Sequence, residues 1–342
     1  MVYTVTSSER NNESASTQET KALLYLMSFR QDSNQIYYFI VDFFNDVTGA
    51  DQAGSCGWDV QSKASKNLNQ SSVGRYLVTL YKNYLSGFRF NSYILFTNGF
   101  SDAILINKEL SEFTITNFTD VARTKIAHFL KDEALSKSYI DSNCITDENI
   151  EDFLTKVIFV VANTEKSNYI KKIIKVNPEI LPSEEYLERI FDQIRATQTD
   201  KKNVNTENIT INHFSEFANY KKHLTSHEIK MLVLSRLIHK NGINHTPLCF
   251  YPLLDGLKEI EKKELIEDCH DRMARVICDI NNSSYYWNLF EEIYKNVSSN
   301  PNISVNEIYE RLDPQKVNNI QFLDIISTKF FISLVKDGIQ YD

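Results

Sequence analysis

The hydrophobic pattern of this 342-residue chain changes part-way along its length, and this change constrains the fold more than any other feature. Over about the first 165 residues, segments with apolar side chains at helical spacing alternate with short aromatic and β-branched runs typical of strands. From Ser183 onward almost every segment has helical periodicity. We therefore expect a three-layer α/β domain followed by an all-helical domain.

The expected organisation has four parts. They are a disordered polar lead at 1–15, the α/β domain at 16–182, a helix and linker at 183–208, and a helical domain at 209–342. The linker is placed at 196–208 because this stretch is polar and lacks apolar periodicity.

Composition gives a consistent picture of the expected compartment. No run of about 18 apolar residues occurs, and the start of the sequence lacks the apolar core of a signal peptide. The five cysteines are scattered and odd in number, which fits reduced thiols. We therefore expect a cytoplasmic protein.

Individual elements of the α/β domain follow from periodicity and turn residues. Helices are expected at 17–29, with Thr17 as N-cap, and at 72–86 and 118–135. Strands are expected at 36–47, 58–65 and 92–97, and 153–162 is either a strand or a buried helix.

Charge is distributed unevenly along the chain. The net charge of −8 opposes unspecific binding to nucleic acid, so any such contact must come from a local basic surface. Four acids and no Lys or Arg lie between Asp42 and Asp59, whereas the stretch from Val60 to Ser101 contains no acid. The basic residues of that stretch are Lys63, Lys66, Arg75, Lys82 and Arg89.

The chemistry-bearing residues lie on the two strands around this change of charge. Side chains alternate faces along a strand, so Asp59, Gln61 and Lys63 share one face of the second strand. Asp42 and Asp46 share a face of the first strand, and pairing of the two strands can bring Asp46 beside Gln61 and Lys63.

Phosphodiester hydrolysis uses these residue types together. The Asp46 carboxylate and the Gln61 carbonyl are oxygen ligands for Mg²⁺ or Mn²⁺. Such an ion polarises a phosphoryl oxygen and lowers the pKa of bound water, and Lys63 can orient that water. Accessory candidates are Asp42, Asp59 and Glu19, although Glu19 is also explained as a favourable charge near a helix N-terminus. Candidate DNA contacts are Lys66, Arg75 and Lys82, although solvated helix positions explain Arg75 and Lys82 equally well.

Other motifs are weaker. His223 and His227 are four residues apart, but Glu228 is misplaced for a metalloprotease helix. Cys269, His270 and Cys278 lack the paired spacing of a structural zinc site. No glycine-rich phosphate loop is present, so no ATPase activity is expected.

The order of these elements resembles restriction-endonuclease-like nucleases and, more narrowly, the nuclease domain of bacterial anti-phage effectors of the CBASS and Lamassu types. The resemblance covers most of residues 15–165. It is carried by 18–26, 42–48, Gln61-Ser62-Lys63, the helix from Val73, and 94–99. Gln61 stands where an acid is commoner, which leaves fewer anionic metal ligands. The resemblance implies a restriction-endonuclease-like core and a metal-dependent endonuclease acting on double-stranded DNA.

The resemblance also implies partners. CBASS nucleases carry a sizeable nucleotide-sensing domain, whereas residues 209–342 are short and helical, as suits a Lamassu nuclease that receives its signal from an SMC-like ATPase. The helical domain would then serve docking or homo-oligomerisation, for which the candidate aromatics are Tyr285, Tyr286, Trp287, Phe290, Phe330 and Phe331, unless these pack in a core. The alternatives are a CBASS-like nucleotide-activated nuclease and a non-catalytic nucleic-acid-binding scaffold subunit.

Overall fold

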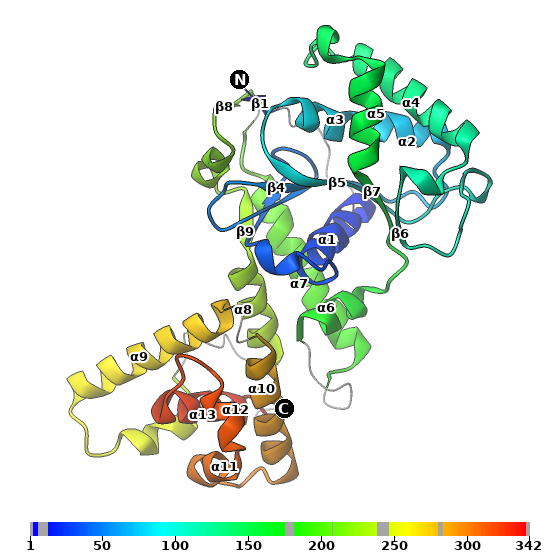
Figure 1. Cartoon of the computed structure of the whole chain (residues 1–342). Coiled ribbons are helices and arrows are strands. Elements are labelled where there is room, and N and C mark those ends of the chain that lie inside the picture. The colour runs from blue at the N-terminus through cyan, green and yellow to red at the C-terminus, as the bar shows by residue number, and fades with distance from the viewer. Residues whose placement is uncertain are drawn as a thin grey trace. The chain divides into compact units, whose positions relative to one another are not determined.

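The computed structural model describes residues 3–5, 13–174, 181–206, 208–237, 246–279 and 283–339 (Figure 1). The chain forms a mixed α/β region followed by a mostly helical region. It divides into two compact units, which we call the first unit (1–169 and 192–225) and the second unit (170–191 and 226–342).

The first unit is built on a seven-stranded mixed sheet. Its strand order is β6-β7-β5-β4-β3-β2-β9, so β4 is the central strand. The strands are β2 (Tyr38–Val41), β3 (Val47–Ala50), β4 (Gly57–Lys63), β5 (Phe90–Thr97), β6 (Glu112–Thr114), β7 (Val157–Val161) and β9 (His223–Thr225). The neighbours β4, β5 and β7 pair in parallel, whereas the other neighbouring strands of this sheet pair antiparallel. Strand β5 is buried along most of its length because both of its faces are covered. A separate two-stranded sheet joins β1 (Tyr3–Thr4) to β8 (Thr210–Ile211).

Helices cover both faces of the large sheet (Figure 1). On one face α1 (Glu13–Ser28) packs on β3 and β4, and the end of α7 (Glu184–Lys202) packs behind it, where Thr20 donates to the Gln198 amide oxygen at 2.8 Å. On the other face lie α2 (Gln70–Tyr76), α3 (Val78–Leu85), α4 (Asp120–Leu135) and α5 (Asp147–Lys156). The threonines before α4 and α5 are N-caps, because each accepts a hydrogen bond from the backbone of the first turn.

The second unit consists largely of helices. They are α8 (Ser226–Leu237), α9 (Glu259–Cys278), α10 (Ser283–Ser299), α11 (Val305–Arg311), α12 (Pro314–Asn318) and α13 (Ile325–Ile339), with a 3₁₀ helix at Leu248–Leu254. Helix α13 packs against α9, α10, α11 and that 3₁₀ helix. Five of the six candidate docking aromatics, all except Tyr285, are buried, so core packing explains them. In the described part of the chain no helix is long and apolar enough to cross a bilayer.

The division into units differs from the expected one. Residues 196–202, expected as linker, form the last turns of α7, and the stretch after His213, expected as helix, contains β9 at the sheet edge. Helix α6 (Lys166–Ile174) and α7 each belong partly to both units, so both units are discontinuous in sequence.

Local elements also differ from expectation. The strand expected at 36–47 is broken after Val41 by a bend at 42–46, where Asp42 has φ 48° and β3 turns back to pair with β2. The helix expected at 72–86 is divided at Leu77 into α2 and α3. The ambiguous segment 153–162 is the end of α5 followed by β7.

The N-terminal residues were expected to be disordered up to residue 15. Tyr3 and Thr4 instead form β1, and the described part of α1 begins at Glu13, so Thr17 is inside the helix and not its N-cap. Residues 1–2 and 6–12 lie outside the described residues.

Gly74 gives a direct test of how α2 meets α4. A Cβ at Gly74 would lie 2.7 Å from both the Ile126 carbonyl oxygen and the Phe129 Cβ, which are parts of α4 that cannot move aside alone. We expect Gly74→Ala to lower the free energy of unfolding by about 1–3 kcal/mol in urea titrations. The exposed neighbour change Arg75→Ala should stay within about 0.5 kcal/mol of wild type. Equal stability of both variants would show that the close contact is absent.

Candidate functional site

The bend between β2 and β3 places Asp46 against the end of the central strand. Val47 pairs with Val60 in antiparallel register, so Asp46 lies opposite Gln61. The Asp46 Oδ2 accepts hydrogen bonds from Gln61 Nε2 at 2.6 Å and from the Ser62 amide at 2.7 Å. Lys63 Nζ lies 4.0 Å from the same oxygen. The predicted proximity of Asp46, Gln61 and Lys63 is confirmed, while their catalytic role stays a prediction.

Gln61 joins this end of β4 to the helix above it. Its side chain is buried, and its Oε1 accepts a hydrogen bond from Thr79 Oγ1 of α3 at 2.5 Å. The amide nitrogen therefore faces Asp46. A hydroxyl can accept as well as donate, so rotating the amide by half a turn would keep the contact with Thr79. That rotation would direct the Gln61 carbonyl oxygen towards Asp46.

Glu19 reaches the same neighbourhood from α1. Burial raises the pKa of its carboxyl to about 7, the Lys202 ammonium opposes this shift, and the Asp46 and Asp42 carboxylates add to it. Glu19 is only 4% exposed and forms an ion pair with Lys202, at the end of α7. The accessory candidate Glu19 is thus brought within electrostatic range of Asp46.

Asp42 is held by a second distant lysine. Lys222 Nζ lies 3.2 Å from Asp42 Oδ2 and donates to the Asp42 carbonyl at 3.0 Å. Lys222 is 1% exposed, so its ammonium needs these oxygens. Sequence analysis missed Lys202 and Lys222, because neither has a local pattern that connects it to acids about 180 residues earlier.

Asp59 differs from the other acids because it is completely buried. It accepts a hydrogen bond from Asn83 Nδ2 of α3 at 2.6 Å and one from Thr48 Oγ1 at 3.0 Å. Burial raises the pKa of the Asp59 carboxyl to about 7. The Asn45 amide donates to Asp59 at 3.5 Å, and its oxygen accepts from the Asp46 backbone at 3.1 Å. Asp59 therefore fixes the backbone on both sides of Asp46, as a positioning residue.

The Asp59 network continues to the N-terminal strand. The Tyr3 hydroxyl donates to Asn83 Oδ1 at 2.7 Å, and Asn83 Nδ2 also donates to the Phe44 carbonyl at 3.1 Å, within the bend. Tyr3 itself packs on Phe44, with ring centroids 5.5 Å apart. The bend at 42–46, which contains Asp46, is thus held in place by contacts with β1 as well as with α3.

The groups around Asp46 that could take part in binding a hard divalent cation are oxygens. Three carboxylates lie near one another here, those of Glu19, Asp42 and Asp46. Each has a lysine ammonium group beside it, from Lys202, Lys222 and Lys63 in that order. The donors available to an ion are the Asp46 and Glu19 carboxylates and, after amide rotation, the Gln61 carbonyl, all of which are oxygens. Among the described residues no group of three or more His, Cys, Asp or Glu side chains could hold a metal ion. An ion at Asp46 would therefore keep several water ligands, as Mg²⁺ usually does.

The three candidate DNA-binding residues have different surroundings. Lys66 and Arg75 are exposed, as a phosphate contact requires. Lys82 instead donates to the Thr4 carbonyl at 3.0 Å and lies 4.3 Å from the centroid of the Tyr3 ring. Burial lowers the pKa of Lys82 to about 8. Lys82 thus links β1 to α3. These contacts explain the presence of a lysine at this position without any contact to DNA.

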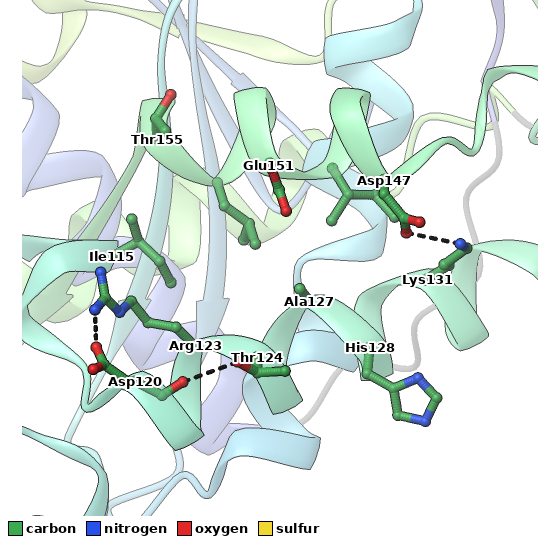
Figure 2. Close-up of a pocket in the computed structure, with 12 residues that line it drawn as sticks. Ile115, Asp120, Arg123, Thr124, Ala127, His128, Lys131, Asp147, Glu151 and Thr155 are labelled. Atoms are coloured by element: carbon green, nitrogen blue, oxygen red, sulfur yellow. Dashed lines mark hydrogen bonds and ion pairs between the residues drawn. The ribbon is translucent and has the colours of Figure 1, made fainter.

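A separate cavity of about 760 Å³ lies between α4 and α5 (Figure 2). Four of its charged residues form two ion pairs: Arg123 with Asp120, and Lys131 with Asp147 at 2.7 Å. None of the residues predicted for the site lines this cavity. The candidate site therefore remains at the end of β4.

Comparison with models of protein families, with curated proteins and with solved structures found no match for this chain. Function must therefore be argued from the residues around Asp46.

The role of Asp59 can be tested by removing the oxygens that accept its hydrogen bonds. Asp59→Leu leaves the Asn83 amide and the Thr48 hydroxyl without their acceptors, so we expect a loss of about 1–3 kcal/mol in urea unfolding at pH 5. Asp59→Asn keeps an acceptor oxygen for Asn83 and can turn its N–H₂ to the Thr48 hydroxyl, so it should lose much less than Asp59→Leu. Equal losses in the two variants would contradict the proposed hydrogen bonds.

Asp59 should also contribute to the pH dependence of stability. Its carboxyl has a pKa near 3.8 when unfolded and about 7 when folded, so folding favours the protonated form. This contribution is complete below about pH 4 and is lost as the pH rises to 7. We expect Asp59→Asn to flatten the decline in unfolding free energy between pH 4 and pH 7. An unchanged slope would show that Asp59 ionises normally in the folded chain.

Proposed function

We propose that this chain is a metal-dependent endonuclease that acts on double-stranded DNA with Mg²⁺ or Mn²⁺. The observation that carries the proposal is the convergence of Asp46, Gln61 and Lys63 at the end of the central strand. The mixed sheet with helices on both faces is compatible with a restriction-endonuclease-like core, the fold that the sequence resembles.

Each residue has a distinct task in this proposal. Asp46, with Gln61 and Glu19 as further oxygen donors, would hold the divalent ion, which supplies electrophilic activation of the phosphate and a more acidic water. Lys63 Nζ is next to Asp46 and would orient the attacking water and offset charge on the phosphoryl group. The Tyr76 ring, 5.4 Å from Lys63 Nζ, restricts where that ammonium can lie.

The biological setting is also a proposal and rests on the resemblance. The chain would act in the cytoplasm as an effector of bacterial defence against phage or plasmid DNA. An SMC-like ATPase would control it through the second unit, as in Lamassu systems. A single site of this kind cuts one strand, so double-strand breakage requires two sites brought together in an oligomer.

One observation favours a second candidate function, that of a non-catalytic nucleic-acid-binding scaffold. Glu19 and Asp42 already hold the ammonium groups of Lys202 and Lys222, so their charge is balanced within the chain. Titration calorimetry with Mn²⁺ separates the two functions. Binding that is lost in Asp46→Asn supports the nuclease, and no binding at millimolar Mn²⁺ supports the scaffold.

Cleavage of supercoiled plasmid tests the catalytic assignment. We expect Lys63→Ala and Asp46→Asn each to lower the rate at least about 100-fold, and EDTA to abolish it, because the reaction needs both the ion and the oriented water. The matched controls Lys125→Ala and Asp102→Asn change exposed residues and should cut as wild type does.

Two outcomes would contradict these roles. If Lys63→Ala lowers the unfolding free energy by more than about 2 kcal/mol, Lys63 is a structural residue. If Asp42→Asn stops cleavage while Asp46→Asn does not, the metal-binding acid is Asp42.

Control by association gives a further prediction. We expect the dilute monomer to be weakly active, because an acidic chain has little affinity for DNA and one site cuts one strand. Double-strand cleavage should rise with the dimer or higher oligomer population seen by mass photometry, and addition of the ATPase partner should increase both. Full double-strand cleavage by a chain that mass photometry shows to be monomeric would contradict this account.

A further inference from the structure

A polar pocket of about 530 Å³ opens beside the carboxyl end of β5. Its lining comes from α1 and from the residue after β5: Glu13, Ser14, Thr17, Gln18, Lys21 and Asn98. Thr97 pairs with Lys63 in the sheet, so Asn98 lies one residue beyond the strand position next to Lys63. Gln18 precedes Glu19 on α1. The pocket therefore adjoins the candidate site along both α1 and the end of β5.

Gln18 lines this pocket, and its buried side-chain amide has an unsatisfied donor. Its side chain is 3% exposed, and within the described part of the chain its Nε2 has no hydrogen-bond partner. Buried amide N–H groups are nearly always paired in folded proteins, because desolvation without a partner is costly. An acceptor supplied by a ligand would satisfy this group.

The charges around the pocket favour an anion. Lys21 Nζ donates to the Thr164 carbonyl at 2.8 Å, and an ammonium has three donors, so it can also bind a ligand. The acid of the pocket, Glu13, accepts a hydrogen bond from Arg195 at 3.1 Å. Arg195 also donates to the Thr17 hydroxyl at 3.1 Å, which adds positive charge at the pocket edge.

We propose that this pocket binds a phosphate group of the nucleic-acid backbone, next to the phosphate held at Asp46. In this proposal Gln18 Nε2 and the Lys21 ammonium donate to the phosphate oxygens. The DNA strand would run from Lys63 past the backbone of Asn98 to reach them. This inference rests on the proposed function, because it assigns the neighbouring phosphate of the same substrate. Phosphate contacts of this kind position a nucleic acid without reading its sequence.

Duplex binding by the full chain tests the inference without cleavage. All variants carry Lys63→Ala, and fluorescence anisotropy follows a labelled duplex of about 30 base pairs, long enough for several backbone contacts. We expect Gln18→Leu and Lys21→Gln each to weaken binding about fivefold or more, and Lys21→Gln to reduce the salt slope of log K by about 1. Lys21→Arg should retain most of the affinity. Lys125→Gln, an exposed lysine on α4, should change affinity less than about twofold.

The outcomes separate this inference from the proposed function. If the Lys63→Ala chain binds the duplex and neither Gln18→Leu nor Lys21→Gln differs from the Lys125→Gln control, the subsite is overturned and the nuclease remains. If the Lys63→Ala chain binds no duplex at low salt, even at concentrations where mass photometry shows it to be oligomeric, both are overturned. If inorganic phosphate raises the melting temperature through Gln18 while duplex affinity is unaffected by Gln18→Leu, the pocket is a free-phosphate site and the inference is overturned. Melting curves show whether each variant is folded. If Gln18→Leu does not fold, the duplex affinity of Lys21→Gln, a change at a half-buried position, tests the phosphate site.

Discussion

The buried carboxyl of Asp59 is the interaction on which the rest of the candidate site depends. Asp59 lies on the central strand and receives hydrogen bonds from α3, from β3 and from the bend that carries Asp46. A buried acid without such donors would be strongly unfavourable, so the bend and the helix are held in the positions that satisfy it. The geometry of Asp46 is thus a consequence of satisfying a carboxyl group that is completely buried.

Charge balance is the second constraint. Glu19, Asp42 and Asp46 lie near one another at the end of β4, and mutual repulsion would open this region without nearby cations. Lys202 and Lys222 supply them from segments that follow long after the acids in sequence. Each of the three acids thus has a lysine ammonium group beside it, and the charges of the region balance within the chain.

This charge arrangement also relates the two polar regions along α1. Glu19 faces the acidic site, whereas Gln18 and Lys21 line a pocket with donors and positive charge. Under the proposed function, a phosphodiester strand would need both environments: an ion at the scissile phosphate and donors at its neighbours. One helix packed on the central strands can supply both because adjacent residues point in different directions around its axis.

The sequence by itself determined the alternation of helix and strand, the helical second half, and the meeting of Asp46 with Gln61 and Lys63, because these depend on local periodicity and on the pairing of neighbouring strands. Only the tertiary structure decided the bend at Asp42, the return of β9 to the sheet edge, and the burial of Asp59. It also decided the pairing of Glu19 with Lys202 and of Asp42 with Lys222. The lysine pairings and the return of β9 arise from contacts between segments about 180 residues apart, whereas Asp59 is enclosed by packing of the central strand against β3 and α3. Local sequence patterns contain no information on such contacts, because the cost of an unpaired buried charge is felt only once the core has formed.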